Sequence, residues 1–391
     1  MTGITKETEK KLQKYRDDFI HYVTDGKAPQ LTHDIVQDDI NYIYKKIGLA
    51  KPKIIIADSH LAEKLLMNHV IENEGLGEET IFQKNWEKVE EPAWNDAQQK
   101  IIKEYGEVKK FAQLCWEPLR ATLEVNIASR VDRVERDQVG KGNYGTIDNI
   151  KDQFEQNGLK YKAKPKQHKF IEYNTGLVSQ PAFVSFNYLR LFEGFKFTET
   201  FERVIDFLLK GIWSINHFEK HVFITRMPTK ISLDQRNRIS STTDAAIKWR
   251  DGVEFNFIYG NHFEHDLWQK VVSKSMDLQQ ITSMTNVDQR MIAIDIKGYD
   301  ELLTTENSKL IDKSKRGNQL YEVTGVLPNG RKQLFLKYKD LSTDRPMISE
   351  VPQQYTDPST KQTVVLNTAD KAMGWKFYLV EKRYAELKNE S

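Results

Sequence analysis

The chain has a single cysteine, and this scarcity excludes several kinds of site. Cys115 has no second cysteine with which to form an intramolecular disulfide, and cysteine ligands cannot build a zinc or iron–sulfur site. The lack of a disulfide framework is typical of a reducing compartment. Glycine and proline are also scarce, at 20 and 11 of 391 residues, which excludes a low-complexity or largely disordered chain.

Long apolar runs and a strong excess of one charge are missing as well. No apolar run reaches the roughly 18 to 20 residues that a membrane-spanning helix needs, and the first residues include charges rather than an apolar secretory signal. Lysine and arginine number 58 against 56 aspartates and glutamates, so the net charge of +2 argues against a chain built mainly to coat nucleic acid or an anionic membrane. We therefore expect a cytoplasmic protein without a membrane partner.

The spacing of apolar residues predicts an α+β fold in two lobes. Residues 1–216 are expected to form a mainly helical lobe with one short strand at Lys53–Ala57, broken by loops near 140–145 and 160–169. Residues 217–391 are expected to form a sheet-rich, mostly antiparallel lobe with one inserted helix.

Several local signals refine this division. The apolar spacing extends a helix from Thr198, its expected N-cap, as far as Trp213, and places the inserted helix over 281–294. Asp251-Gly252 predicts a two-residue type I′ hairpin turn, and 328–330 (Pro-Asn-Gly) predicts a second hairpin. The charged residues of the helical pattern over 94–138 are expected to form solvated faces.

Short segments spread over most of the chain carry a resemblance to a known family: Tyr44–Pro52, Gly211–Trp213, Thr225–Thr229, Ala245–Gly252, Tyr259-Gly260, Asn286–Arg290, Gly298, Ile311-Asp312, Gly317–Tyr321, Val351-Pro352 and Thr368–Trp375. In their order and spacing they resemble a bacterial family of uncharacterised proteins whose members are often encoded beside, or fused to, leucine-rich repeats. The chain departs from the family at Ile239-Ser240, where the family has Leu-His, so no role for that histidine carries over. The family implies no established activity.

The segment from Ala245 to Gly260 also resembles one unit of a bacterial β-hairpin repeat related to MORN repeats. The likeness lies in its Asp251-Gly252 turn and its Tyr259-Gly260 ending. Because only one such unit is visible, the segment is expected to be a piece of sheet rather than a repeat array.

Asp58 and His60 directly follow the predicted strand at Lys53–Ala57. Ligands bind at the carboxyl ends of strands in open α/β sheets, so these side chains are candidates for an acid–base or phosphate-binding role. The alternative is that Asp58 or Ser59 simply caps the following helix.

Three further residues are candidates for ligand binding. Asn286 and Arg290 are four apart and would project from one side of the predicted helix, while Arg226 ends a predicted strand. An arginine can clamp a carboxylate or phosphate through its planar fork. The alternative is a structural arginine that satisfies backbone carbonyls or a nearby carboxylate.

His262 and His265 form a His-x-x-His pair after a predicted strand. Such a pair could chelate zinc or manganese if a third ligand came from elsewhere, but it lacks the helical His-Glu-x-x-His arrangement of zinc proteases. The alternative is a polar turn. No particular cofactor is indicated.

A basic segment and the lone cysteine complete the candidates. The segment is a potential phosphate-binding arm, with a solvated loop as the favoured alternative, and contains Lys160, Lys162, Lys164, Lys166 and Lys169. Cys115 is expected at a helix start, where it would be a small buried residue rather than a nucleophile.

Together these patterns predict an intracellular bacterial binding or regulatory module that recognises a protein or a small anionic ligand. The alternative is an enzyme that acts on nucleic acid or a nucleotide, in bacterial conflict or defence. Convergence of the candidate residues at one place favours the enzyme, and their dispersal favours the binding module.

Overall fold

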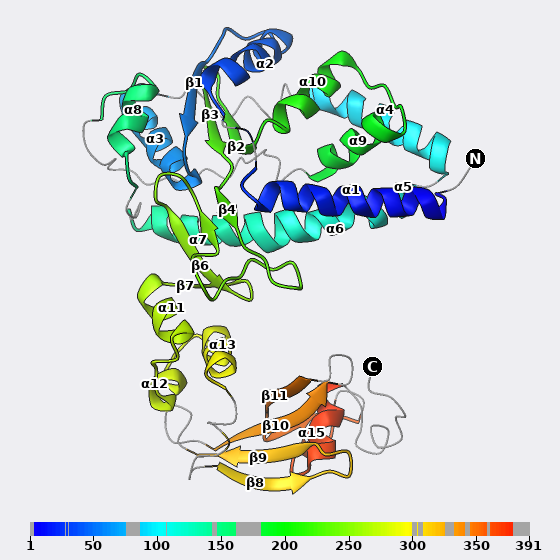
Figure 1. Cartoon of the computed structure of the whole chain (residues 1–391), viewed down its shortest axis with the longest axis vertical. Coiled ribbons are helices and arrows are strands. Elements are labelled where there is room, and N and C mark those ends of the chain that lie inside the picture. Colours follow the sequence, from blue (N-terminus) through cyan, green and yellow to red (C-terminus); the bar gives the residue numbers. More distant parts are fainter. Residues whose placement is uncertain are drawn as a thin grey trace. The chain divides into compact units, whose positions relative to one another are not determined.

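The fold is α+β, as predicted, and divides into two units (Figure 1). The first unit spans Met1–Glu264 and the second His265–Ser391. The computed structural model describes residues 4–27, 29, 31–75, 87–106, 108–142, 147–161, 181–298, 303, 308–324, 332–340, 345–357 and 360–377. None of the helices among these residues combines the length and apolar character that crossing a bilayer requires.

A three-stranded sheet lies at the centre of the first unit. Its strands are β1 (Lys53–Ala57), β2 (Ile212–His217) and β3 (His221–Arg226), in the order β1-β3-β2. β1 runs parallel to β3, and β2 runs antiparallel to it. The expected lobe boundary at 216/217 falls inside this sheet. Sequence periodicity could not predict that β1 belongs to the same sheet as β2 and β3, because it carries no information on pairing between strands that are distant along the chain.

Helices surround this sheet. α3 (His60–Asn73) packs against β1 and β3, and every residue from His60 to Val70 is buried. Ser59 caps α3 by accepting a hydrogen bond from the Ala62 amide, as the sequence predicts. Further helices of the first unit are α1 (Lys6–Thr24), α2 (His33–Lys46), α4 (Glu87–Tyr105) and α8 (Ile150–Gln156).

The residues of the predicted helical pattern over 94–138 are divided between α4 and one long helical segment. After α4 ends, a helix with two π-helical stretches runs from Val108 to Gly140. Its consecutive parts are α5 (Val108–Phe111), η2 (Ala112–Trp116), α6 (Glu117–Leu119), η3 (Arg120–Ala128) and α7 (Ser129–Gly140). Cys115 therefore lies inside a helix rather than at its start.

The first unit also contains two further helices and a small meander. α9 (Pro181–Phe192) precedes α10 (Glu199–Leu208), which Thr198 caps as predicted. The predicted extension of this helix to Trp213 is wrong, because Trp213 lies in β2 and packs edge-on against Trp249. The meander is antiparallel and consists of β4 (Lys230–Ile231), β5 (Ile247–Lys248), β6 (Glu254–Ile258) and β7 (Asn261–Phe263).

The turn between β5 and β6 is one residue longer than the predicted type I′ hairpin. Trp249 donates its amide hydrogen to Val253 O over 2.9 Å, which leaves Arg250, Asp251 and Gly252 in the loop. Gly252 adopts a φ of +79°, as expected for a three-residue hairpin loop.

The second unit contains a helical group and a separate antiparallel sheet. The helices are α11 (His265–Val272), α12 (Leu278–Thr282) and α13 (Val287–Lys297), so the single predicted helix over 281–294 is in fact two helices. The four-stranded sheet contains β8 (Ser308–Lys313), β9 (Gln319–Val323), β10 (Gln333–Asp340) and β11 (Arg345–Val351). The predicted turn at 328–330 lies outside the described residues.

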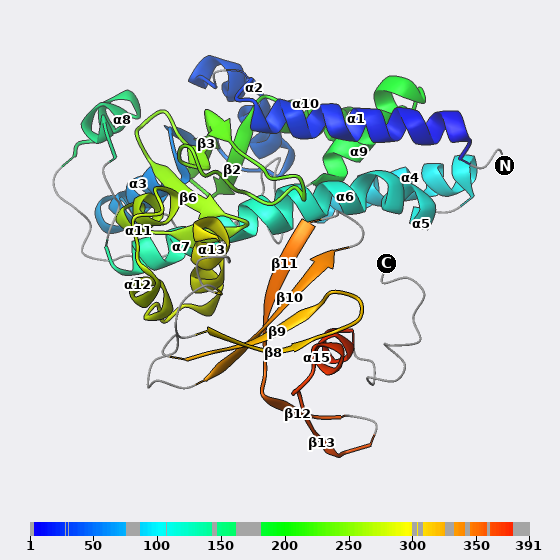
Figure 2. The same ribbon diagram turned by 60° about the horizontal axis from the view of Figure 1, so that its bottom comes forward.

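The described part of the second unit also contains a hairpin and a further helix. β12 (Gln354–Thr356) pairs with β13 (Thr363–Val365), and α15 (Ala369–Lys376) follows. Figure 2 shows α15 beside the β8–β11 sheet, where Met373 packs into a small core with Leu320 and Leu336.

Candidate functional site

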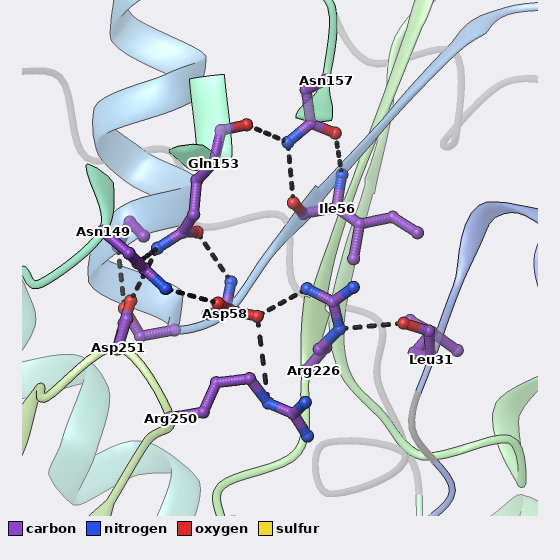
Figure 3. A network of polar contacts seen from close by, with 11 residues as sticks. Leu31, Ile56, Asp58, Asn149, Gln153, Asn157, Arg226, Arg250 and Asp251 are labelled. Carbon is purple, nitrogen blue, oxygen red and sulfur yellow. Dashed lines mark hydrogen bonds and ion pairs between the residues drawn. The ribbon is translucent and has the colours of Figure 1, made fainter. Parts of the chain in front are cut away.

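Two predicted site residues meet at the carboxyl ends of β1 and β3. Arg226 Nη1 donates to Asp58 Oδ1 over 2.5 Å, and Arg226 Nε donates to Leu31 O over 2.9 Å (Figure 3). Asp58 is 7% exposed, so this is a largely buried ion pair. The parallel pairing of β1 with β3 brings the two residues together from positions far apart in the sequence.

A second guanidinium group approaches the same carboxylate. Arg250 Nε lies 3.9 Å from Asp58 Oδ1, and the Arg250 side chain is 33% exposed. Burial lowers the pKa of Arg226, Asp58 opposes that shift, and the charge of Arg250 reinforces it. Arginine stays protonated in proteins, so two cations approach one carboxylate oxygen here.

Side-chain amides from α8 hold Asp58 from the other side. Gln153 Oε1 accepts from the Asp58 amide over 2.9 Å, and Asn149 Nδ2 donates to Asp58 Oδ2 over 3.4 Å (Figure 3). Gln153 Nε2 also donates to Asn149 and to the fully buried Asp251. Burial raises the pKa of Asp251. These contacts fix the position of Asp58 relative to the hairpin loop that carries Arg250.

The outer edge of β1 also pairs with side chains. Asn157 Oδ1 accepts from the Ile56 amide over 2.7 Å, and Asn157 Nδ2 donates to Ile56 O over 2.9 Å. His33 Nε2 donates to Ile54 O over 3.2 Å. The strand that leads to the candidate site is therefore anchored on both sides.

A second polar cluster begins at His60, the first residue of α3. His60 Nδ1 forms a close hydrogen bond with Glu135 Oε2 of α7 and lies 3.7 Å from Asp132 Oδ1. His60 and Glu135 are fully buried, whereas the Asp132 side chain is 30% exposed. The expectation that charged residues of this helical segment form solvated faces is therefore wrong for Glu135.

Glu63 is held from three directions on the other side of His60. It accepts hydrogen bonds from Ser214 (2.9 Å), Asn216 (2.7 Å) and Thr225 (2.9 Å), and its Oε2 lies 3.3 Å from His60 Nε2. Burial raises the pKa of Glu63, but the charges of Lys64 and His60 and the hydrogen bonds leave the pKa below its ordinary value. Glu63 is therefore a fixed, buried carboxylate.

The histidine and the α7 carboxylate form a coupled pair. Burial alone would lower the pKa of His60, but the Glu135 carboxylate holds it above its ordinary value. Burial raises the pKa of Glu135, and His60 only partly offsets that rise. The pKa of each side chain is raised, and both shifts favour a proton held in the hydrogen bond between His60 and Glu135.

Asn286 and Arg290 both have structural roles. The prediction that they project from one side of a helix is wrong, because Asn286 precedes the helix that contains Arg290. Asn286 is the N-cap of α13, where its Oδ1 accepts from the Gln289 amide over 3.1 Å. Arg290 is buried and donates to Met284 O over 3.2 Å. Both residues belong to the second unit, whereas Asp58, His60 and Arg226 belong to the first.

His262 and His265 do not gather a third metal ligand among the described residues. His262 lies in β7 against the rings of Phe255 and Phe257, and burial lowers its pKa. His265 begins α11 in the second unit and stacks on Trp268. Within the part of the chain that the structure describes, the one group of three potential metal ligands is His60, Asp132 and Glu135, whose ligand atoms lie within 4.8 Å of one another.

The predicted basic arm can be examined only at its first residue. Lys160 is exposed, and Lys162, Lys164, Lys166 and Lys169 lie outside the described residues. Cys115 is buried, as predicted, and burial raises the pKa of its thiol to about 11.

An arginine cluster on α7 has no counterpart in the sequence-based expectations. Arg130 Nη1 donates to Gly260 O, and burial followed by repulsion from Arg133 and Arg238 lowers the pKa of Arg130. Arg238 pairs with Asp234 at 2.7 Å and lies over the ring of Tyr259. The Arg130 side chain also leaves little room for a side chain at position 260, because a Cβ at Gly260 would lie 2.9 Å from Arg130 Cζ.

The signals for the missed residues are weak in the sequence. Asp132 and Glu135 are three apart and so share a helix face, but that spacing is common on solvated helices. Glu63 follows His60 by three residues in a helix that is buried all round. Comparison of the chain with protein-family models, with curated proteins and with solved structures found no match.

Proposed function

We propose that the first unit binds a small anionic ligand at Arg226 and Arg250. The observation that carries this proposal is that two guanidinium groups approach one carboxylate oxygen of Asp58, at 2.5 and 3.9 Å. The short contact goes to Arg226, and Arg250 Nε stays beyond hydrogen-bond distance of Asp58. A phosphate or carboxylate group of a ligand would accept hydrogen bonds from Arg250.

The position and exposure of the two arginines support this proposal. They lie where β1 and β3 end, and the carboxyl edge of parallel strands is where open α/β sheets bind ligands. Arg226 is mostly buried and fixed by Leu31 O, whereas one third of the Arg250 side chain is exposed. Arg250 would therefore meet the ligand first, and Arg226 would set the position of Asp58.

Isothermal titration calorimetry with inorganic phosphate and pyrophosphate, at low ionic strength and in the presence of a chelator, tests this function. We expect Arg250→Gln to weaken binding by about tenfold or more, the loss of one charge-assisted contact. Arg236→Gln is the matched control, since Arg236 is an exposed arginine in a neighbouring loop. Equal binding by both variants, or no binding by the wild-type chain at millimolar anion, would refute the proposal.

A second candidate function is the binding of a nucleotide or nucleic acid, as an enzyme acting on them would require. It is favoured by Arg130, which the charges of Arg133 and Arg238 approach, and by the Tyr259 ring, over which Arg238 lies. Arginines with an aromatic ring suit phosphates and stacked bases. The test is salt-dependent binding of a fluorescent single-stranded oligonucleotide, which Arg133→Gln should weaken and Arg120→Gln, on the exposed surface of the same helix, should not.

Three wider statements stay predictions. They are the cytoplasmic location in a bacterium, the membership of the family associated with leucine-rich repeats, and the recognition of a protein partner.

A further inference from the structure

We propose that His60, Asp132 and Glu135 form a binding site for one divalent transition-metal ion. The site lies where the N-terminus of α3 meets α7, and its argument is independent of the proposed anion site. Mn²⁺ and Zn²⁺ are the ions that its donor set suits.

The three ligand atoms are close enough to share an ion. His60 Nδ1 lies 3.7 Å from Asp132 Oδ1, and the ligand atoms of all three residues lie within 4.8 Å of one another. Ligand atoms about 2.1 Å from a common ion are separated from one another by at most about 4.2 Å. Small side-chain rotations would therefore bring the set into coordination.

The backbone holds the three residues in place. Asp132 and Glu135 are three apart in α7 and so project from the same side of that helix. His60 is the first residue of α3, whose start is fixed by the Ser59 cap. Ligands on two helix backbones need little ordering when an ion binds.

The carboxylates around His60 also suit a cation. The carboxylates of Glu63, Asp132 and Glu135 lie within 4 Å of the imidazole nitrogens, and Lys64 Nζ lies 3.9 Å from Glu63 Oε2. A divalent ion in place of the proton between His60 and Glu135 would add positive charge among these carboxylates. Glu135 Oε1 is buried and accepts no hydrogen bond from any residue that the structure describes, so it is an available ligand atom.

Glu63 lies close to the other ring nitrogen of His60, on the side where metal-binding histidines usually have an outer partner. Its Oε2 lies 3.3 Å from His60 Nε2, and three hydrogen bonds from β2 and β3 fix it there. A carboxylate on one ring nitrogen orients the imidazole so that the other nitrogen faces the metal. Here that other nitrogen is Nδ1, which faces Asp132 and Glu135.

The ligand atoms determine which class of ion the site suits, and the partly exposed Asp132 gives the ion access to the site. One imidazole nitrogen with carboxylate oxygens suits first-row transition metals, whereas Ca²⁺ and Mg²⁺ prefer oxygen ligands alone. The Asp132 side chain is 30% exposed, so an ion would enter from that side.

The test uses the full chain after treatment with a chelator and removal of the chelator by dialysis. Calorimetric titration with MnCl₂ and ZnCl₂ should show one equivalent bound per chain, with CaCl₂ binding much more weakly. Asp132→Asn should weaken Mn²⁺ and Zn²⁺ binding by about tenfold or more. Asp137→Asn, on the same helix and exposed, should leave binding unchanged.

Two further measurements make the result decisive. Pulsed electron paramagnetic resonance of the Mn²⁺-loaded wild-type chain should show coupling to one imidazole nitrogen, and it does not depend on the folding of any variant. The double variant His262→Gln/His265→Gln should still bind the ion. Absence of binding, absence of nitrogen coupling, or loss of binding in the double variant but not in Asp132→Asn would overturn the proposal.

Discussion

Asp58 and Arg226 occupy the next position of the β1–β3 register after Ala57 and Thr225, and their side chains form a 2.5 Å ion pair there. The pair joins the ends of two parallel strands and lies beside Arg250. The contact between Asp58 and Arg226 therefore both stabilises the folded chain and sets the position of the proposed anion site.

Arg226→Gln and Asp58→Asn should each destabilise the folded chain by about 3 kcal/mol, because each leaves a buried charge without its partner. The double variant should cost less than the sum of the two single variants. Urea denaturation followed by circular dichroism measures all three free energies of unfolding. The exposed pair of Lys141 and Asp137 provides the comparison, and Asp137→Asn should have little effect. Strict additivity of Arg226→Gln and Asp58→Asn would show that the two side chains do not interact.

The sequence identifies Asp58 and Arg226 as candidates because each ends an apolar strand pattern. It does not show that they meet, because parallel pairing between strands so distant in the chain leaves no mark in local periodicity. The same limit explains the wrong lobe boundary, since the first strand of the chain pairs with one placed in the other lobe.

Asn286 and Arg290 show a different limit. The apolar spacing continues through the break between α12 and α13, so one long helix is predicted and Asn286 is placed inside it. Asn286 is instead the N-cap, a role for which asparagine is one of the preferred residues. Glu63 and Glu135 could not be predicted as buried, because charged residues on helices usually face solvent unless a partner is present.

Asn157→Ala should destabilise the edge of β1. The change leaves the buried N–H and C=O groups of Ile56 without the Asn157 side chain, at a cost of about 2 kcal/mol or more. Hydrogen exchange of the Ile56 amide should become faster. Glu155→Ala, an exposed change in α8 just before Asn157, should leave that exchange rate unaltered, and equal rates in both variants would contradict this account of the contact.

Acid should destabilise the chain through His217. Burial lowers the pKa of His217 from 6.5 to about 3, so below pH 6.5 the unfolded chain binds a proton that the folded chain does not. The stability that His217 contributes is therefore lost progressively as the pH falls from about 6.5 toward 3, at a slope approaching about 1.4 kcal/mol per pH unit.

Denaturation of the wild type and of His217→Gln between pH 7.5 and 4.5 measures this term. The free energy of unfolding of the wild type should fall more steeply on acidification than that of His217→Gln. His21→Gln, at an exposed position in α1, should follow the wild type. Parallel curves for the wild type and His217→Gln would disprove the assignment.

Gly260→Ala should be more harmful than Gly48→Ala. The φ values of Gly260 and Gly48 are similar, +80° and +78°. An alanine would be strained by about 1–2 kcal/mol at either position. Only Gly260 faces a neighbour, since its Cβ would lie 2.9 Å from Arg130 Cζ, while nothing lies within 4 Å of a Cβ at Gly48. Thermal unfolding compares the two variants. Arg130→Ala should reduce the excess cost of Gly260→Ala, and an undiminished cost would assign it to another cause.

Cys115 should be unreactive in the folded chain. It is buried and its thiol pKa is raised to about 11, so little thiolate forms at pH 8. Labelling with a chromogenic disulfide reagent should be slow in buffer and complete in denaturant, and because the chain has one cysteine the signal reports this residue alone. Rapid stoichiometric labelling under native conditions would contradict the prediction.

The side chains that pair with β1 also limit how the chain can recognise another protein. β1 is the outer strand of its sheet, and an outer strand is the usual place where a peptide adds as a further strand. His33 occupies the carbonyl of Ile54, and Asn157 occupies both backbone groups of Ile56. Strand addition at this edge is therefore blocked, which also protects the sheet from edge-to-edge aggregation on this side.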